Sequence, residues 1–327
     1  MHAALVKRRS LGATGIQVSE IGFGTWAIGG DGNGTMGYGP TLDEESLAAL
    51  HEARSLGCTL FDTSNLYGWG HSEALLARAF AVCRREVVLA TKAGYVSPDG
   101  RQDFSPDAIR RSVDCSLQRL QTDHLDLLQL HNPSPEALEE DDGLFAALDT
   151  MQREGIIRAF GISAGSPDEA QLFVSRHRPA FLQVNFNLGD LRAWRSGLFE
   201  TCRQQGIGVI VRTPLAAGFL SGRIGEADTF AASDHRRRYG AEMRTRWTEA
   251  VRLLRPVFDD APEATPAQNA IRFALSFDAV SAVIPGMTRV SDVREDFGTA
   301  GLPRLREDQL CAVEAIYERV FTRMADG

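Results

Sequence analysis

Short apolar runs alternate along most of the chain with longer segments in which apolar residues recur every three or four positions. Runs such as LDLLQL and GVIV are apolar almost throughout, as is typical of parallel strands covered on both faces. Segments with the longer period are typical of amphipathic helices. The pattern predicts strands at residues 20–23, 58–61, 87–90, 125–130, 157–162, 181–185, 208–211 and 281–284. It predicts helices at residues 42–56, 72–82, 105–120, 143–154, 167–176, 196–205, 242–260, 290–297 and 307–324.

The alternation of strands and helices predicts the fold class. Such repeats form right-handed βαβ units, and eight of them favour a closed (β/α)8 TIM barrel, which accommodates 327 residues as a single domain spanning 1–327. Two short extended pieces around Gly12–Gly15 predict an N-terminal β-hairpin, and the last helices extend the barrel at its C-terminal side. A doubly wound open sheet is the competing fold. However, no Gly-x-Gly-x-x-Gly lies between the first strand and the first helix, where dinucleotide-binding open sheets carry it.

Charge and cysteine content narrow the class of protein. The net charge of −8 argues against nucleic-acid binding, which needs a basic surface. The run His235–Arg238 is a local exception, which is either a solvated loop or a contact to an anionic ligand. Five scattered cysteines without a Cys-x-x-Cys pair indicate free thiols in a reducing cytoplasm. No apolar run suits a signal peptide or a membrane span, so we expect a cytoplasmic protein without membrane partners.

Four polar residues lie at or just beyond the ends of consecutive predicted strands: Asp62, Tyr67, Lys92 and His131. Taken singly, such residues are more often helix caps, surface charges or rim residues. The C-terminal ends of barrel strands converge on one face, where active sites of this fold are built. Together the four residues therefore indicate a catalytic site.

The chemistry of this set suits proton transfer. A free tyrosine has a pKa near 10 and is a poor proton donor near neutral pH. A neighbouring ammonium group stabilises the tyrosinate, and Lys92 can do this if Asp62 holds it in place. His131 can orient a substrate carbonyl toward Tyr67. No metal-ligand spacing and no nucleophile with a partner base are evident, and no side chain supplies hydride, so a cofactor is implied.

The chain also resembles a known family. The motifs FDTSNLYGWGHSE, TKAG, LLQLHNP, FGIS, LQVNFN, VIVRTPLAAGFLSGR and VIPGMTR, in this order, look like those of the aldo-keto reductases, from about Ser10 to Phe297. The resemblance implies a (β/α)8 barrel that binds NADP(H) in an extended pose without a Rossmann domain. It also implies that the tetrad Asp62, Tyr67, Lys92 and His131 serves hydride transfer from the nicotinamide to an aldehyde or ketone.

Carried over position by position, the resemblance implies a set of cofactor contacts. Ser163 and Gln183 would hold the nicotinamide carboxamide. The residues near the cofactor and the substrate opening would be Gly24, Thr25 and Trp26. The loop near the pyrophosphate would contain Pro214, Leu215 and Gly218, with Arg223 as its basic residue. The segment at the adenosine 2′-phosphate would be Gly286, Met287, Thr288 and Arg289.

Three departures from the family pattern bear on the cofactor. Ala164 stands where the family often has Asn, which implies that one hydrogen bond to the carboxamide would be missing. Arg212 replaces the aromatic residue that often stacks on the nicotinamide, and its charge would repel the cationic oxidised ring. Asp292 and Asp296 would oppose a 2′-phosphate if they face it, or are solvated helix charges if they do not. We therefore expect a preference for NADPH over NADH that is weaker than in members without these carboxylates.

The leading hypothesis is an NADPH-dependent carbonyl reductase with a small-molecule carbonyl substrate. An NAD(P)-dependent sugar or polyol dehydrogenase is an alternative, because the same site runs in both directions. A non-catalytic barrel like the regulatory β-subunits of potassium channels is another, although the short, non-basic N-terminal lead argues against it. Trp26, Trp69 and Tyr95 are expected to wall the substrate site, together with the loop 29–40 and Phe186; equally, the aromatic residues could pack the barrel rim.

Overall fold

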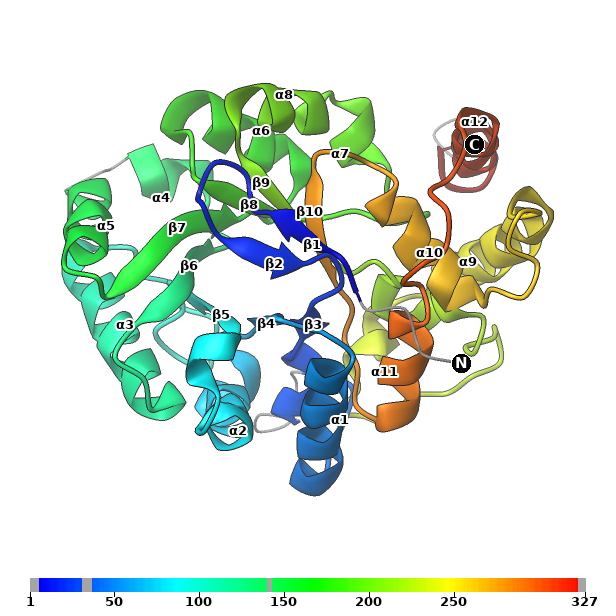
Figure 1. Ribbon diagram of the computed structural model, residues 1–327. Helices are drawn as coiled ribbons and strands as arrows, with labels where there is room; N and C mark the ends of the chain where they lie inside the picture. Colours follow the sequence, from blue (N-terminus) through cyan, green and yellow to red (C-terminus); the bar gives the residue numbers. More distant parts are fainter. Residues whose placement is uncertain (1–5, 31–36, 140–142, 323–327) are drawn as a thin grey trace.

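Eight parallel strands form the centre of the fold (Figure 1). The computed structural model describes residues 6–30, 37–139 and 143–322. The strands are β3 (Phe23–Gly24), β4 (Leu60–Asp62), β5 (Val88–Ala93), β6 (Leu125–His131), β7 (Ile157–Ser163), β8 (Phe181–Asn185), β9 (Gly208–Arg212) and β10 (Val280–Ile284). Each pairs with its neighbours in sequence order, and parallel bridges from Ile21 to Val283 and from Gly24 to Gly286 join the two ends. The sheet thus closes into the predicted barrel.

An antiparallel hairpin covers one end of the barrel. It consists of β1 (Arg8–Ser10) and β2 (Gln17–Ser19), as the turn residues predict. Its apolar residues Leu11, Ile16 and Val18 pack into the barrel interior. The backbone of Gly12 has a φ of +52° and lies so close to the start of β9 that a Cβ would meet the Gly208 nitrogen at 2.3 Å. The hairpin therefore covers the N-terminal ends of the strands, which leaves the C-terminal ends for a site.

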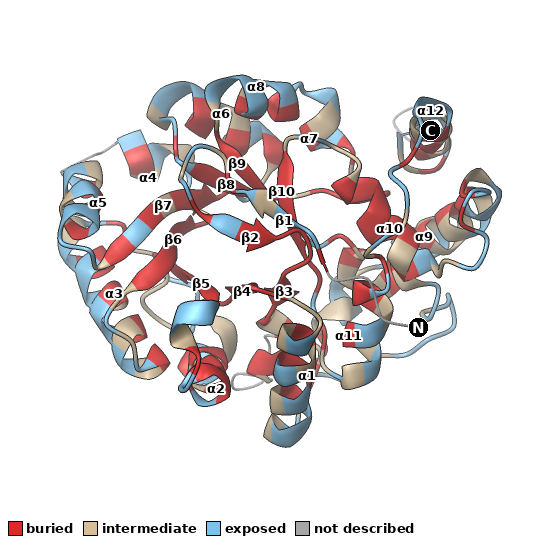
Figure 2. Cartoon of the chain, in the orientation of Figure 1, coloured by how far each residue is buried: buried red, intermediate tan, exposed pale blue. Residues whose placement is uncertain are grey.

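Helices pack around and beside the barrel, and those around it turn their buried faces toward the strands (Figure 2). They are α1 (Asp43–Ser55), α2 (His71–Phe80), α3 (Pro106–Leu120), α4 (Pro135–Glu139), α5 (Leu144–Arg153), α6 (Pro167–His177), α7 (Arg192–Arg195), α8 (Leu198–Gln205), α9 (Ala241–Leu254), α10 (Pro266–Leu275), α11 (Val290–Phe297) and α12 (Glu307–Tyr317). Local signals explain several starts: Ser105 and Ser166 cap α3 and α6 through their side chains, and proline follows each cap. Among the described residues, no helix is long and apolar enough to cross a membrane.

Two predicted helix ends are wrong, and two short helices were not predicted. The predicted helix 242–260 ends at Leu254, because Pro256 cannot donate a backbone hydrogen bond and its ring crowds the preceding turn. The predicted helix 307–324 changes at Glu318 into one wider π-type turn that runs to Thr322. The short helices α4 and α7 lie in segments that the apolar pattern left as connections. None of these differences changes the barrel.

The C-terminal helices α9 and α12 lie beside the barrel and not around it (Figure 1). The stretch between β9 and α9 contains two 3₁₀ turns, at Ala216–Ser221 and His235–Arg238. Trp247 on α9 and Phe321 in the turn that follows α12 line the cavity at the open end of the barrel. The extension of the fold therefore contributes a wall to the site.

Candidate active site

The four residues predicted for catalysis meet at the C-terminal end of the barrel. Asp62 ends β4, Lys92 lies on β5, His131 ends β6, and Tyr67 lies in the 3₁₀ turn that follows β4. The Lys92 ammonium is fully buried and donates to Asp62 Oδ1 at 2.5 Å, Thr63 O at 2.9 Å and Tyr67 Oη at 3.1 Å. All three ammonium protons therefore have acceptors. The tyrosine hydroxyl thus lies against a fixed positive charge.

Two hydrogen bonds to the second oxygen of Asp62 hold the carboxylate in place. Gln129 Nε2 donates to Asp62 Oδ2 at 2.7 Å, and Gln183 Nε2 donates to it at 2.8 Å. Burial by itself would lower the pKa of Lys92, but the charge of Asp62 and the Tyr67 hydroxyl outweigh it and raise that pKa. Lys92 therefore stays charged. The sequence analysis missed Gln129, although a glutamine inside the mostly apolar run LDLLQL was a signal for it.

His131 is held as a neutral ring. Burial lowers its pKa well below the ordinary value, and the charges of Lys92 and Arg212 lower it further. Its Nδ1 lies 3.1 Å from Ser64 Oγ, and the Tyr95 ring meets it edge-on at 4.9 Å. In the tautomer in which Ser64 donates to Nδ1, Nε2 carries the proton. His131 can then donate a hydrogen bond without carrying charge.

Arg212 is fixed at the end of β9 by neutral acceptors. Its Nε donates to Asn185 Oδ1 at 2.9 Å, and its Nη2 donates to Ala164 O at 2.7 Å. Its Nη1 donates to Asn132 Oδ1 at 3.0 Å and to Ser163 Oγ at 2.6 Å. Within the described residues no carboxylate pairs with it, and burial lowers its pKa. Asn132 and Asn185 were missed by the sequence analysis, because their roles depend on contacts between distant strands.

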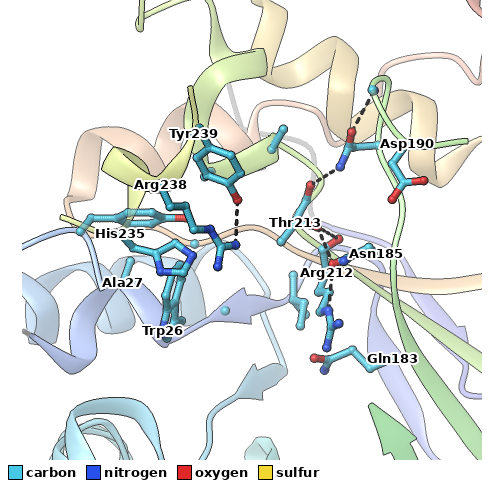
Figure 3. Close-up of a pocket in the computed structure, with 18 of the residues that line it drawn as sticks. Trp26, Ala27, Gln183, Asn185, Asp190, Arg212, Thr213, His235, Arg238 and Tyr239 are labelled. Atoms are coloured by element: carbon cyan, nitrogen blue, oxygen red, sulfur yellow. Dashed lines mark hydrogen bonds between the residues drawn. The ribbon is translucent and has the colours of Figure 1, made fainter. Parts of the chain in front are cut away.

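A cavity of about 690 Å³ opens above these residues (Figure 3). The predicted site residues that line it are Gly24, Thr25, Trp26, Asp62, Tyr67, Tyr95, His131, Gln183, Arg212 and Gly286. Ser163 is buried behind them, where it accepts from Arg212 and lies 3.5 Å from Gln183 Oε1. The lining residues that the sequence analysis missed include Asn187, Asp190, Arg246, Trp247, Tyr317 and Phe321.

Two expected substrate contacts lie elsewhere. Trp69 is 40% exposed and is not among the described residues that line the cavity. Phe186 is fully buried and packs against Phe199, Phe273 and Phe277 in the core. Within the loop 29–40, residues 31–36 lie outside the described residues, while Tyr38 lines the cavity. Trp26 both lines the cavity and packs edge-on against Tyr38 at 5.0 Å, so it also packs the rim.

A second cavity of about 600 Å³ adjoins the first, and the two share lining residues that include Ala27, Thr213 and Gly286. The expected cofactor residues on its wall are Pro214, Leu215, Gly218, Arg223, Gly286, Thr288, Arg289, Asp292 and Asp296. Met287 is instead buried in the hydrophobic core. The two cavities together provide a long space from the tetrad to the start of α11.

The carboxylates of α11 face this second cavity. Asp292 Oδ2 accepts from the backbone N–H groups of Thr288 at 3.3 Å and Arg289 at 3.2 Å. Arg223 is paired with Asp292 at 2.8 Å and also forms an ion pair with Glu295. Arg289 is exposed and lies 3.9 Å from Glu45. Asp292 thus occupies the N-terminus of α11. Of the two arginines, Arg289 has the weaker ion-pair contacts, so more of its hydrogen-bond donors are available to a ligand.

Asp296 is 3% exposed. Burial raises the pKa of its carboxyl group to about 8, the nearby Asp292 raises it as well, and Arg223 lowers it. Among the described residues, its side chain makes no hydrogen bond or ion pair. At neutral pH this group is therefore mostly uncharged.

Comparison with known proteins identifies the family. The family model of the aldo/keto reductases matches residues 20–318. This chain belongs to the aldo/keto reductase family. It is 31% identical over 291 residues to the aldo-keto reductase yakc [NADP(+)] of Schizosaccharomyces pombe, covering 86% of this chain and 83% of the relative. It is 34% identical over 233 residues to the NADH-specific methylglyoxal reductase of Escherichia coli, covering 67% and 70%.

Solved structures agree with this assignment. The glycerol dehydrogenase AKR11B4 from Gluconobacter oxydans superposes with a TM-score of 0.80 at 25% identity, covering 100% of this chain and 98% of that one. The predicted family and (β/α)8 fold are thus confirmed. As an aldo/keto reductase, the protein is an NAD(P)H-dependent oxidoreductase that acts on carbonyl or alcohol groups.

Proposed function

We propose that this aldo/keto reductase is an NADPH-dependent reductase of aldehydes or ketones in which Tyr67 donates the proton. The observation that carries the proposal is the buried Lys92 ammonium, which Asp62 fixes 3.1 Å from the Tyr67 hydroxyl at a cavity wall. The positive charge stabilises the tyrosinate that remains after proton donation. Lys92 cannot turn away, since its other two donors are engaged by Asp62 and Thr63.

The remaining residues of the tetrad orient the substrate. Neutral His131 donates to the carbonyl oxygen, which places that oxygen beside the Tyr67 hydroxyl. When bound, the nicotinamide cofactor supplies the hydride that the reduction requires. Proton donation from Tyr67 at the carbonyl oxygen completes the alcohol.

The residues present fit a dinucleotide. The adjoining cavities give an elongated space, with polar Gln183 at one end and the cations Arg223 and Arg289 at the other. Gln183 and Arg212 would face the nicotinamide end, and the loop from Pro214 to Gly218 would hold the middle. Thr288 and Arg289 would hold the 2′-phosphate.

The charge of Arg212 favours reduction over the dehydrogenase alternative. This guanidinium lines the cavity beside Gln183 and has no carboxylate partner among the described residues. A cation in this place disfavours the positively charged oxidised nicotinamide more than the neutral reduced one. The related glycerol dehydrogenase shows that oxidoreductases of this fold also act on alcohols, so the direction must be measured.

A turnover assay in both directions tests the proposal. Aldehydes, ketones and keto-sugars are supplied with NADPH and with NADH, and the corresponding alcohols with the oxidised cofactors, at neutral pH. We expect the carbonyl reductions with NADPH to have the highest kcat/KM. A higher kcat/KM for alcohol oxidation across the whole panel would contradict the proposal.

Replacement of Arg289 tests the cofactor preference. We expect Arg289→Ala to weaken NADPH binding by about tenfold, because one exposed charge-assisted contact to the 2′-phosphate is lost. NADH lacks this phosphate and should bind almost unchanged. Fluorescence titration gives both dissociation constants. If NADH binds the unaltered protein as tightly as NADPH, the repulsion from Asp292 and Asp296 outweighs the attraction of Arg289, and the predicted preference for NADPH is wrong.

The binding of NADPH should weaken as the pH rises through about 8. The Asp296 carboxyl group, whose pKa is about 8, is neutral below this pH and negatively charged above it, where it repels the 2′-phosphate. We expect the dissociation constant of NADPH to rise several-fold from pH 7 to pH 9, and that of NADH to rise less. Asp296→Asn should remove this difference. An equal pH response of the two cofactors would exclude Asp296 as its source.

A further inference from the structure

The first half of the basic run His235–Arg238 is packed beside the first cavity, whereas Arg237 and Arg238 are exposed. The His235 ring meets the Trp26 ring edge-on at 4.8 Å, and the His235 backbone N–H donates to Gly37 O at 3.0 Å. Arg236 forms an ion pair with Asp234 at 2.6 Å and lies over the Tyr38 ring at 4.8 Å. These contacts fix the segment at the rim and determine where its last arginine lies.

Arg238 projects into the cavity from this rim. Figure 3 shows its side chain reaching into the space across from Arg212 and Gln183. Its Nη2 donates to the Tyr239 hydroxyl at 3.0 Å, which is its one hydrogen bond among the described residues. No carboxylate in the described part of the chain lies within ion-pair distance of it. Most of its five N–H donors therefore remain available to a ligand.

The cavity as a whole has an excess of positive charge. Four arginine and two aspartate side chains line it among the described residues: Arg192, Arg212, Arg238, Arg246, Asp62 and Asp190. Lys92 neutralises Asp62, Arg192 pairs with Asp190 at 2.8 Å, and Arg246 pairs with Glu242 at 2.7 Å. Arg212 and Arg238 remain without a counter-ion. This excess occurs in a chain whose net charge is −8, so it is a local property of the site.

The two unpaired arginines differ in what they can bind. Arg212 already donates to four neutral acceptors near the tetrad, so it contributes charge but few free donors. Arg238 lies at the rim with nearly all its donors unused. The hydroxyl of Tyr239 accepts from Arg238, which leaves its own proton free to donate to the same ligand. A carboxylate or a phosphate matches this pair of donors.

We propose that the substrate is an anionic carbonyl compound, whose carboxylate or phosphate group binds Arg238 while its carbonyl group lies at Tyr67 and His131. The inference rests on the proposed function, since it uses the tetrad as the reacting end. Between the two ends, the cavity is walled by the rings of Trp26, Tyr38 and Trp247, which suit an apolar or cyclic body.

Two matched pairs of ligands test the inference. One pair is 4-carboxybenzaldehyde and its methyl ester, and the other is D-glyceraldehyde 3-phosphate and D-glyceraldehyde. Direct binding is measured by calorimetry and turnover with NADPH by absorbance. We expect the charged member of at least one pair to bind about 10–100-fold more tightly than its neutral partner, as a charge-assisted contact predicts. The pair that shows the difference identifies the anionic group.

Variants assign the difference to one arginine. Arg238→Met should reduce the ratio of the two affinities to nearly one, and Arg238→Lys should retain part of it, since lysine keeps the charge but loses the forked donors. Arg237→Met is the matched control, because Arg237 is exposed, does not line the cavity, and its side chain donates only to Ala232 O among the described residues. It should keep the full ratio.

The outcomes separate the two proposals. Equal affinity for the charged and neutral members of both pairs, or a ratio that survives in Arg238→Met, would overturn the anionic substrate. Tight binding of the charged members without turnover of any carbonyl compound would leave the anion site standing and contradict the proposed reductase. Turnover of the neutral members alone would support the reductase and overturn the anion site.

Discussion

Replacing Tyr67 with phenylalanine should reduce turnover by about 10²–10⁴-fold, which is the usual contribution of a positioned general acid. Tyr67 lines the cavity, and its hydroxyl accepts a hydrogen bond from the Lys92 ammonium at 3.1 Å, as the proposed role of proton donor requires. The phenyl ring keeps the packing, so the fold should be unaffected. Steady-state kinetics with the best carbonyl compound of the panel gives the loss in kcat.

Two controls show that the loss arises from proton donation. The dissociation constant of NADPH should change little, because the Tyr67 hydroxyl is not needed to hold the cofactor. Tyr95→Phe removes a hydroxyl from the same cavity, but within the described part of the chain Lys92 donates to Asp62, Thr63 and Tyr67 and not to this hydroxyl, and the Tyr95 ring packs on His131. It should reduce turnover by less than about tenfold. Near-normal turnover of Tyr67→Phe would show that another group donates the proton.

The sequence was sufficient to predict that Asp62, Tyr67, Lys92 and His131 lie together, because the barrel topology determines where the ends of its strands lie. Once strands and helices alternate eight times, the C-terminal ends of the strands must converge. Residues that follow consecutive strands, such as Asp62 and His131, then lie together without knowledge of any side-chain contact. The hairpin was predictable for a similar reason, since its turn is local and rich in glycine.

Contacts between distant segments were beyond the sequence pattern. Gln129 and Gln183 bind one oxygen of Asp62 from two different strands, and this depends on the register of β6 and β8 around the barrel. Trp247 and Phe321 reach the cavity through the packing of α9 and the C-terminal turn, for which the sequence has no local signal. Phe186 was misplaced because a residue just after a strand can turn either to the cavity or to the core.

At the cavity wall formed by α11, the sequence predicted the helix but not the orientation of its carboxylates. The apolar period places α11 correctly but does not decide which of its carboxylates face inward. Asp292 turns back to the backbone N–H groups of Thr288 and Arg289, which are the groups that would otherwise attract a phosphate. Asp296 is buried and mostly neutral at pH 7 instead of solvated. Their orientation and protonation set the strength of the cofactor preference, and neither can be inferred from residue identity.

Lys92 and Asp62 should act as one unit in both catalysis and stability. Lys92→Met removes the charge that stabilises the tyrosinate, and Asp62→Asn removes the charge that fixes the lysine. Because both changes act through Tyr67, the double variant should lose about as much turnover as the worse single variant. A loss equal to the product of the two single losses would show that the residues act independently.

Stability gives a second test of the same pair. Lys92→Met leaves the Asp62 carboxylate, which is 2% exposed, without its counter-ion, and unpaired buried charges of this kind cost about 3–5 kcal/mol. Asp62→Asn in the same chain removes that charge, while the amide can still bond to Gln129 or Gln183. The double variant should therefore unfold at a higher denaturant concentration than Lys92→Met alone, although it is no more active. Such a recovery of stability without recovery of activity would separate the structural contribution of the ion pair from its effect on Tyr67. If the double variant is instead less stable than Lys92→Met, the carboxylate is held by its two glutamines and not by the lysine.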